Sequence, residues 1–199
     1  MKKLLVIALS ILAINGYTQQ PKMQVKLVDG DLEFLKGEKA IHLQFVYTNM
    51  LIGDDGINEA DYIKRKVSEY NAKVPGSGEG WRSAWFSDRE DRFEPRFIEM
   101  FEKYSSLSTK DEAKYTLIFE TTRTEPGYNV GVQSASARID ADVYIVETSD
   151  PTNVFAQISV TNVPGIESIG FGYHAGYRIQ EAYGRSAVEI GRLIKKKIK

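Results

Sequence analysis

The rarest functional side chains in this 199-residue chain are two histidines and two tryptophans, and they are the first candidates for a site. His174 lies in a Gly-rich passage, Gly170 to Gly176, directly before a predicted helix. Loops at helix entrances often carry catalytic groups. A histidine that acts as a general base needs a nucleophile and an acid beside it, and neither is recognisable from the spacing. We interpret the glycines as backbone freedom for a bend, and keep a catalytic His174 as an alternative.

The two tryptophans, Trp81 and Trp85, lie with Phe86 close to a Gly-rich loop at residues 75–80. Aromatic side chains beside such a loop could line a groove for a sugar or a peptide. Their i, i+4 spacing also places both on one helix face, and such a stripe belongs more often to a core than to a site. The sequence leaves both interpretations open.

Other chemical groups give weaker signals. Asp140 and Asp142 are spaced i, i+2 on a predicted strand, about 7 Å apart, and glycosidases use carboxylate pairs at such separations. Any two acids at this spacing meet that criterion, so we interpret them as part of a solvated face. His42 is interpreted as a structural strand residue, and the acidic stretch at 54–59 lacks the spacing of an EF-hand and indicates helix capping. The sequence therefore predicts no catalytic, metal-binding or cofactor-binding residue.

The N-terminus has the features of a secretory signal peptide. Lys2 and Lys3 precede an apolar run from Leu4 to Ile14, interrupted only at Ser10, which is too short to span a bilayer. We expect cleavage after Thr18, which makes residues 1–18 the signal peptide and residues 19–199 a single mature domain. An uncleaved N-terminal anchor is the alternative.

Composition narrows the classes of partner. Cysteine is absent, which excludes disulfides, thiolate metal sites and a lipid-anchored N-terminal cysteine. Cleavage removes two of 26 basic residues and leaves 24 against 27 acidic ones, a net charge of −3. This balance argues against nucleic acid as a partner. We expect a periplasmic or extracellular protein, most naturally of a Gram-negative envelope, that does not span the membrane after cleavage.

Periodicity predicts an α+β fold in the order β-α-α-α-β-β-β-α. We expect one mixed sheet of about four strands, with helices packed on one face. A possible N-terminal arm or small hairpin covers 19–37, around a turn at 29–31. Asn58 is the expected N-cap of the first helix, which ends before a loop at 75–78. The four predicted strands lie at 41–47, 115–120, 139–146 and 154–160, and the remaining predicted helices lie near 81–86, 93–104 and 179–198.

Two resemblances support this organisation. The segment from Asp142 to Val160, followed by a helix, resembles the strand, acidic turn, strand and helix of envelope accessory domains. These include the penicillin-binding-protein activator, curli-secretion and TolB N-terminal groups. The whole mature chain also resembles a family of small secreted Bacteroidetes proteins, through residues 81–86, 93–95, 124–132 and 178–183. Both resemblances imply an exported α/β domain, and neither implies a catalytic residue.

These observations favour an exported, non-catalytic envelope or secreted accessory protein that contacts another protein or a glycan. The alternative is a small secreted hydrolase, or a glycan- or peptide-binding protein, that uses His174 or the Trp81 and Trp85 pair.

Overall fold

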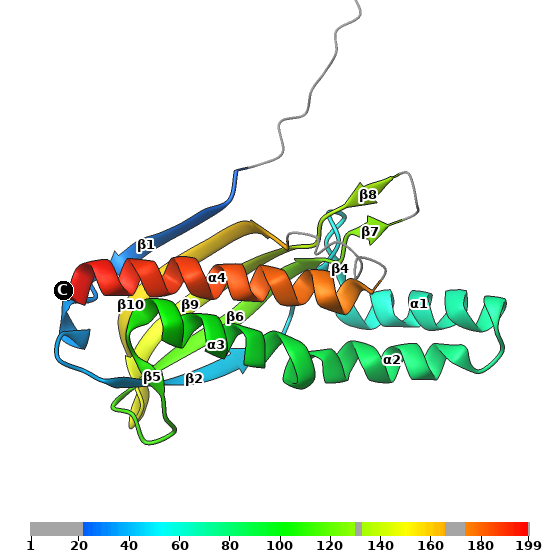
Figure 1. Ribbon diagram of the computed structural model, residues 1–199. Coiled ribbons are helices and arrows are strands. Elements are labelled where there is room, and N and C mark those ends of the chain that lie inside the picture. Colours follow the sequence, from blue (N-terminus) through cyan, green and yellow to red (C-terminus); the bar gives the residue numbers. More distant parts are fainter. Residues whose placement is uncertain (1–21, 130–132, 166–173, 199) are drawn as a thin grey trace, which may run out of the picture.

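A computed structural model describes residues 22–129, 133–165 and 174–198 (Figure 1). An eight-stranded mixed sheet forms the body of the protein, in the order β1-β10-β9-β6-β2-β5, with β3 paired to β6 and β4 paired to β3. The strands β1, β10, β9 and β6 are joined antiparallel, whereas β2 and β3 run parallel to β6. The bounds are β1 (Gln24–Gly30), β2 (Ala40–Val46), β3 (Leu51–Ile52), β4 (Ile57–Asn58), β5 (Ser108–Thr109), β6 (Tyr115–Glu125), β9 (Arg138–Glu147) and β10 (Asp150–Pro164). Two short strands, β7 (Tyr128–Asn129) and β8 (Ser134–Ala135), pair separately.

Two long helices, α3 (Glu94–Ser105) and α4 (Ala175–Ile198), lie side by side across one face of the sheet (Figure 1). The other two, α1 (Glu59–Lys73) and α2 (Ser77–Asp88), form a helical hairpin that extends beyond the end of the sheet. A π-helical turn, η2 (Arg89–Phe93), joins α2 directly to α3, and Pro95 lies in the first turn of α3, where the missing N–H of proline is tolerated. The hairpin and the body therefore share one continuous helical segment.

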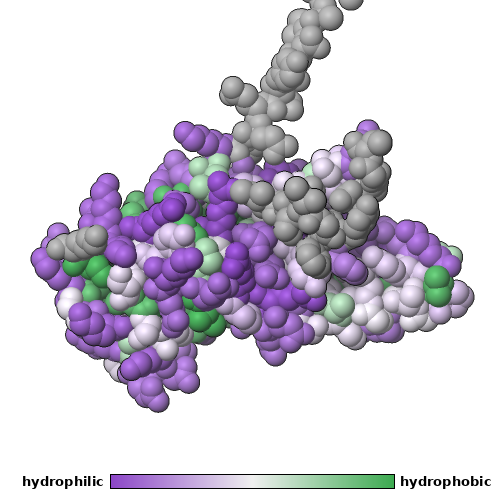
Figure 2. Space-filling view, in the orientation of Figure 1, coloured by the Kyte–Doolittle hydropathy of each residue, from purple (hydrophilic) through white to green (hydrophobic). Residues whose placement is uncertain are grey.

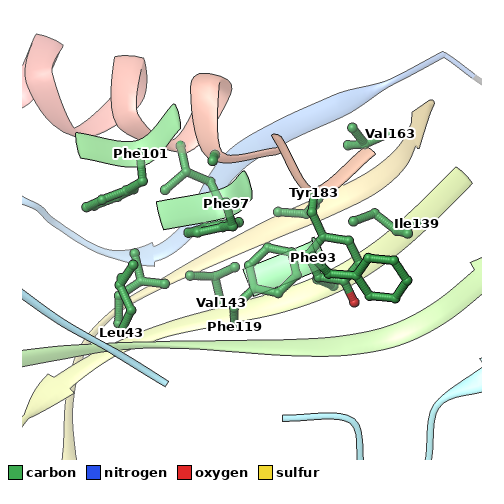
Figure 3. Packing of buried hydrophobic residues seen from close by; sticks show 14 of the residues in the cluster. Leu43, Phe93, Phe97, Phe101, Phe119, Ile139, Val143, Val163 and Tyr183 are labelled. Carbon is green, nitrogen blue, oxygen red and sulfur yellow. The ribbon is translucent and has the colours of Figure 1, made fainter. Parts of the chain in front are cut away.

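The core lies between the sheet and the helix pair α3 and α4. Phe97, Phe119 and Tyr183 are fully buried there, and Figure 3 shows them grouped with Phe93. The rings of Phe93 and Tyr183 stack at 5.1 Å. The buried Tyr183 hydroxyl is satisfied by a 2.6 Å hydrogen bond with Thr121 Oγ1, and burial raises the pKa of Tyr183.

The expectation of about four strands is too low, although the mixed α/β class is confirmed. The four predicted strands form as β2, β6, β9 and β10, and the last two pair as an antiparallel hairpin. The additional strands are the edge strand β1 and the two-residue strands β3, β4 and β5. A two-residue strand has no periodicity to detect. β3 and β5 form beside the longer strands β6 and β2, which offer backbone groups to pair with, and β4 then pairs with β3.

The predicted hairpin around 29–31 does not form. Residues 24–30 pair with β10 as β1, while Leu32 and Leu35 are fully buried around a short 3-10 turn. The two segments that flank the predicted turn therefore contact different parts of the protein and not each other. The predicted loop at 75–78 is also shorter than expected, because α2 already begins at Ser77.

The helical hairpin has a surface of more intermediate hydropathy than the body. Figure 2 shows hydrophilic surface with scattered hydrophobic areas over the body on this face, and paler surface with a hydrophobic spot over the end formed by α1 and α2. Tyr70, Val74 and Phe86 are exposed large apolar residues of this hairpin. Within the described ranges, no helix has the length and apolar character needed to cross a membrane.

Candidate functional site

Residues at the start of α1 and at the turn between α1 and α2 explain why the helical hairpin forms. Asn58 caps α1, as predicted, by accepting a hydrogen bond from the Asp61 backbone N–H at 2.9 Å. Gly76 has φ of +85° at the turn, a conformation that favours glycine. Gly78 brings α2 close to α1, because a Cβ there would lie 2.5 Å from the Val67 carbonyl oxygen. The two helices therefore approach closely enough for their side chains to interlock.

A row of aromatic rings covers one face of this hairpin. Trp81 stacks against Tyr70 at 5.7 Å and against Trp85 at 5.6 Å, and Tyr62 contacts both tryptophans at 5.9 and 5.1 Å. Trp85 is 8% exposed and belongs to the core of the cluster, whereas Tyr70 is 40% exposed. The row thus changes from buried to open along the hairpin, with Trp81 in between.

The opposite wall comes from the end of β6 and the start of α4. Arg178 is 4% exposed and donates hydrogen bonds to the carbonyl oxygens of Pro126 and Gly127 at 3.0 to 3.1 Å. The turn at 126–127 needs Gly127, which has φ of +65° and lies against the backbone of Ala135. Arg178 therefore fixes the turn that carries Tyr128 next to the first residues of α4.

These two walls enclose a groove of about 870 Å³, which we call the aromatic groove. A volume of this size fits a small ligand or a short stretch of polymer. The lining residues are Tyr62, Lys66, Tyr70, Lys73, Trp81, Ala84, Trp85, Asp88, Arg92, Pro126, Gly127, Tyr128, His174, Ala175, Gly176, Tyr177 and Arg178.

An ion pair lies at the inner end of the groove, where α2 meets α4. Arg92 Nε donates to Asp88 Oδ1 at 2.6 Å, and the Arg92 guanidinium lies 4.2 Å from the centre of the Tyr177 ring. Burial raises the pKa of Asp88, and the hydrogen bond from Arg92 opposes that rise. A Cβ at Gly176 would lie 2.0 Å from Asp88 Oδ2, so glycine at that position lets the carboxylate reach the first turn of α4.

All three residues named as candidates from the sequence, Trp81, Trp85 and His174, line this one groove. His174 is exposed, and its ring lies 6.3 Å from that of Tyr177. The other groups considered lie elsewhere. His42 Nδ1 contacts Thr116 Oγ1 at 3.2 Å on the sheet, and Asp140 accepts a hydrogen bond from Arg123 at 2.7 Å.

Sequence reasoning missed most of the groove. Ile63 and Val67 lie on one stripe of α1 and line a separate hollow of about 420 Å³ on the other side of the hairpin. Tyr70 belongs instead with Tyr62, Lys66 and Lys73, which recur at helical spacing on the groove side. That second stripe was detectable in the sequence, whereas the contribution of Tyr177 and Tyr128 depends on the tertiary structure.

The chemical groups in the groove limit the reactions that it could support. Asp88 is the one carboxylate among the described lining residues and is held by Arg92, and His174 supplies the imidazole. No serine or threonine occurs among these described lining residues, so tyrosines carry the side-chain hydroxyls of the described groove. Across the described part of the chain, no group of three or more acidic or histidine side chains is placed to hold a metal ion.

Comparison with known proteins finds no matching family model and no matching curated protein. Two solved structures are similar. One is a PelC dodecamer from Paraburkholderia phytofirmans, at TM-score 0.42 and 8% identity, covering 87% of this chain and 98% of that one. The other is a variant of the same PelC, also at TM-score 0.42 and 8% identity, covering 86% and 98%. A similarity at this level assigns neither a family nor a function to the chain.

Proposed function

We propose that this chain is an exported, non-catalytic binding protein that takes up a saccharide chain in the aromatic groove. The observation that carries the proposal is the row of rings formed by Tyr62, Tyr70, Trp81 and Trp85, which faces Tyr128 and Tyr177 across the groove. The C–H face of a pyranose ring is apolar and its edge carries hydroxyls. Flat aromatic surfaces bordered by polar side chains match both features.

The rigidity of the groove wall supports binding. The Trp85 indole nitrogen donates to Glu59 Oε1 at 2.7 Å, and Arg89 forms an ion pair with the same carboxylate. Both contacts tie the aromatic row to the start of α1 and to η2. A preorganised aromatic surface loses little conformational entropy when a ligand binds.

The export of the chain is a separate part of the proposal, and it is supported by the charged and apolar pattern of residues 1–18. These residues lie outside the described ranges. Expression of the full-length chain in a Gram-negative host, followed by N-terminal sequencing of the exported protein, tests it. We expect a mature chain that begins at Gln19, and a chain that still begins at Met1 contradicts cleavage.

Tryptophan fluorescence tests binding directly. The sequence contains two tryptophans, and both line the aromatic groove, so the whole indole emission reports on this site. We expect oligosaccharides from a panel of glucan, chitin, mannan and galacturonan to produce a saturable change in emission. Replacement of the central ring, Trp81→Ala, should raise the Kd of the bound member about 30-fold, as for the central residue of an interface.

A matched control is available on the same helix. Phe86 is 40% exposed and lines the hollow on the other side of the hairpin, so Phe86→Ala should leave the Kd unchanged. Isothermal titration calorimetry gives the Kd values for both variants independently of their remaining indole emission. The proposal is contradicted if no member of the panel binds, or if both variants lose affinity equally.

The hydrolase alternative has a distinct readout. If His174 acts as a base, incubation with the bound oligosaccharide should release shorter products, and His174→Ala should abolish their release. We expect the wild-type protein to return the oligosaccharide intact, because glycosidases generally use a pair of carboxyl groups. Among the described lining residues only Asp88 carries one, and it is held by Arg92.

A further inference from the structure

The charged residues of the aromatic groove are arranged in a regular way along α1. Tyr62, Lys66, Tyr70 and Lys73 alternate aromatic and cationic side chains on the groove side of this helix. The Lys66 ammonium lies 6.0 Å from the centre of the Tyr62 ring, and the Lys73 ammonium lies 6.0 Å from that of Tyr70. Each of the two tyrosine rings that α1 contributes to the groove is therefore accompanied by a lysine.

The charge balance of the groove is opposite in sign to that of the chain. Among the described lining residues, Lys66, Lys73, Arg92 and Arg178 are cationic and Asp88 is the single carboxylate. Glu69 also approaches from the rim and pairs with Lys66 at 2.8 Å. Four cations against two carboxylates leave an excess of two positive charges, whereas the whole chain has a net charge of −1.

The two ion pairs differ in how easily a ligand could replace them. The pair between Lys66 and Glu69 is solvent-exposed, with side chains 30% and 45% exposed. Exposed pairs of this kind contribute little to stability, so Lys66 can exchange Glu69 for a ligand carboxylate at low cost. Arg92, in contrast, is held between Asp88 and Tyr177. It is therefore better suited to shape the inner end of the groove than to exchange its partner for a ligand.

The same arrangement disfavours a cationic ligand. Cations bind well to aromatic faces, but here Lys66, Lys73 and Arg92 already lie near the rings of Tyr62, Tyr70 and Tyr177. A ligand cation would meet like charges at each of these rings. The groove therefore favours a ligand that combines apolar ring faces with negative charge.

We propose that the ligand is an acidic glycan, with sugar rings on Trp81 and Tyr70 and carboxylates at Lys66 and Lys73. This inference rests on the proposed saccharide-binding function and specifies its ligand class. Lys66 and Lys73 are seven residues apart, about 10 Å along a helix axis. That separation is comparable with the length of a disaccharide, so carboxylates on nearby sugar rings can reach both lysines.

The experiment compares acidic oligosaccharides with their own neutral forms. Hexamers of galacturonate and of mannuronate, and a hyaluronan hexamer, are each titrated beside the fully methyl-esterified form of the same chain, with tryptophan emission as the readout. Esterification removes the charge and keeps the sugar rings. We expect at least one acidic hexamer to bind at least tenfold more tightly than its ester, and this preference should shrink as ionic strength rises.

Variants of α1 assign the preference to the proposed residues. Lys73→Ala should weaken binding of the acidic hexamer a few-fold and leave binding of the ester unchanged, because it removes one partly exposed charge contact. Lys64→Ala is the matched control, since Lys64 lies on the same helix and lines the hollow on the other side of the hairpin. Circular dichroism verifies that both variants are folded.

The possible outcomes distinguish failure of the acidic preference from failure of saccharide binding as a whole. Equal binding of acidic and esterified forms, or a Lys73→Ala variant that behaves like wild type, overturns the acidic preference and leaves saccharide binding intact. Absence of binding by every saccharide overturns both. Binding of a hexaglutamate peptide without any saccharide binding also overturns both, and assigns the groove to acidic peptides.

Discussion

The indole nitrogen of Trp85 donates a 2.7 Å hydrogen bond to Glu59 Oε1, and this bond links the second helix of the hairpin to the first turn of α1. Glu59 also pairs with Arg89 of η2, so one half-buried carboxylate joins three helical segments. The helices α1 and α2 extend beyond the sheet and pack mainly on each other. Their stability therefore depends strongly on this contact.

Removal of this hydrogen bond should loosen the hairpin. Trp85→Phe keeps an aromatic ring but leaves Glu59 without the indole donor, so we expect the free energy of unfolding to fall by about 1 to 2 kcal/mol. Denaturant unfolding followed by circular dichroism measures this. Trp81→Phe is the control at a half-buried position of the same row, with an expected loss of about 0.5 kcal/mol. Equal losses in the two variants would show that ring size, and not the hydrogen bond, stabilises the hairpin.

Two glycines of α4 should respond to alanine with opposite signs. In a helix interior, Gly→Ala stabilises by about 0.5 to 1 kcal/mol when space allows. At Gly184 an added Cβ would lie 3.1 Å from the flexible Arg96 side chain, whereas at Gly191 it would lie 2.9 Å from the backbone nitrogen of Ser105. We expect Gly184→Ala to raise the melting temperature. Gly191→Ala should lower the melting temperature and reduce the free energy of unfolding by about 1 to 3 kcal/mol, because α3 must move.

The stability of the protein should depend on pH through the half-buried carboxyl of Glu94. Burial raises the pKa of this group, partly opposed by the 3.1 Å hydrogen bond that it accepts from the Tyr47 hydroxyl. A raised pKa in the folded state means that the folded protein binds the proton more tightly than the unfolded chain. The stabilisation is complete below the unfolded pKa of about 4.3 and is lost as the pH rises through the higher folded pKa.

Glu94→Gln removes this titration. The variant should therefore gain stability relative to wild type as the pH rises above about 4.3, and the difference should level off above the folded pKa. Chemical denaturation at a series of pH values measures the difference between the two proteins. A difference that stays constant across this range contradicts the assignment to Glu94.

Arg178 should be required for the wall of the groove opposite the tryptophans. Its guanidinium donates to the carbonyl oxygens of Pro126 and Gly127, a geometry that a lysine ammonium does not reproduce. We expect Arg178→Lys to lower the free energy of unfolding by about 1 to 3 kcal/mol and to speed amide exchange at Gly127 and Tyr128. Arg192→Lys, at an exposed ion pair of the same helix, should change neither.

The sequence by itself determined the elements with strong periodicity. The alternation at 41–47, 115–120, 139–146 and 154–160 predicted β2, β6, β9 and β10, because a strand with one buried face must alternate. Asn58 and Pro95 marked helix starts through local backbone chemistry. The sequence also identified Trp81, Trp85 and His174 as the residues to examine, although it did not place them together.

Only the tertiary structure decided what these residues share. Trp81 and His174 are far apart in the chain, and they line one groove because η2 joins the hairpin to α3, beside which α4 packs. Strand β1 and the two-residue strands form by pairing with other strands: β1 pairs with β10, β3 with β6, β5 with β2 and β4 with β3, and no local pattern encodes these pairings. The charge excess in the groove likewise depends on which helix faces meet. Side-chain type and short-range periodicity are local properties, whereas a binding groove is a property of surfaces brought together by folding.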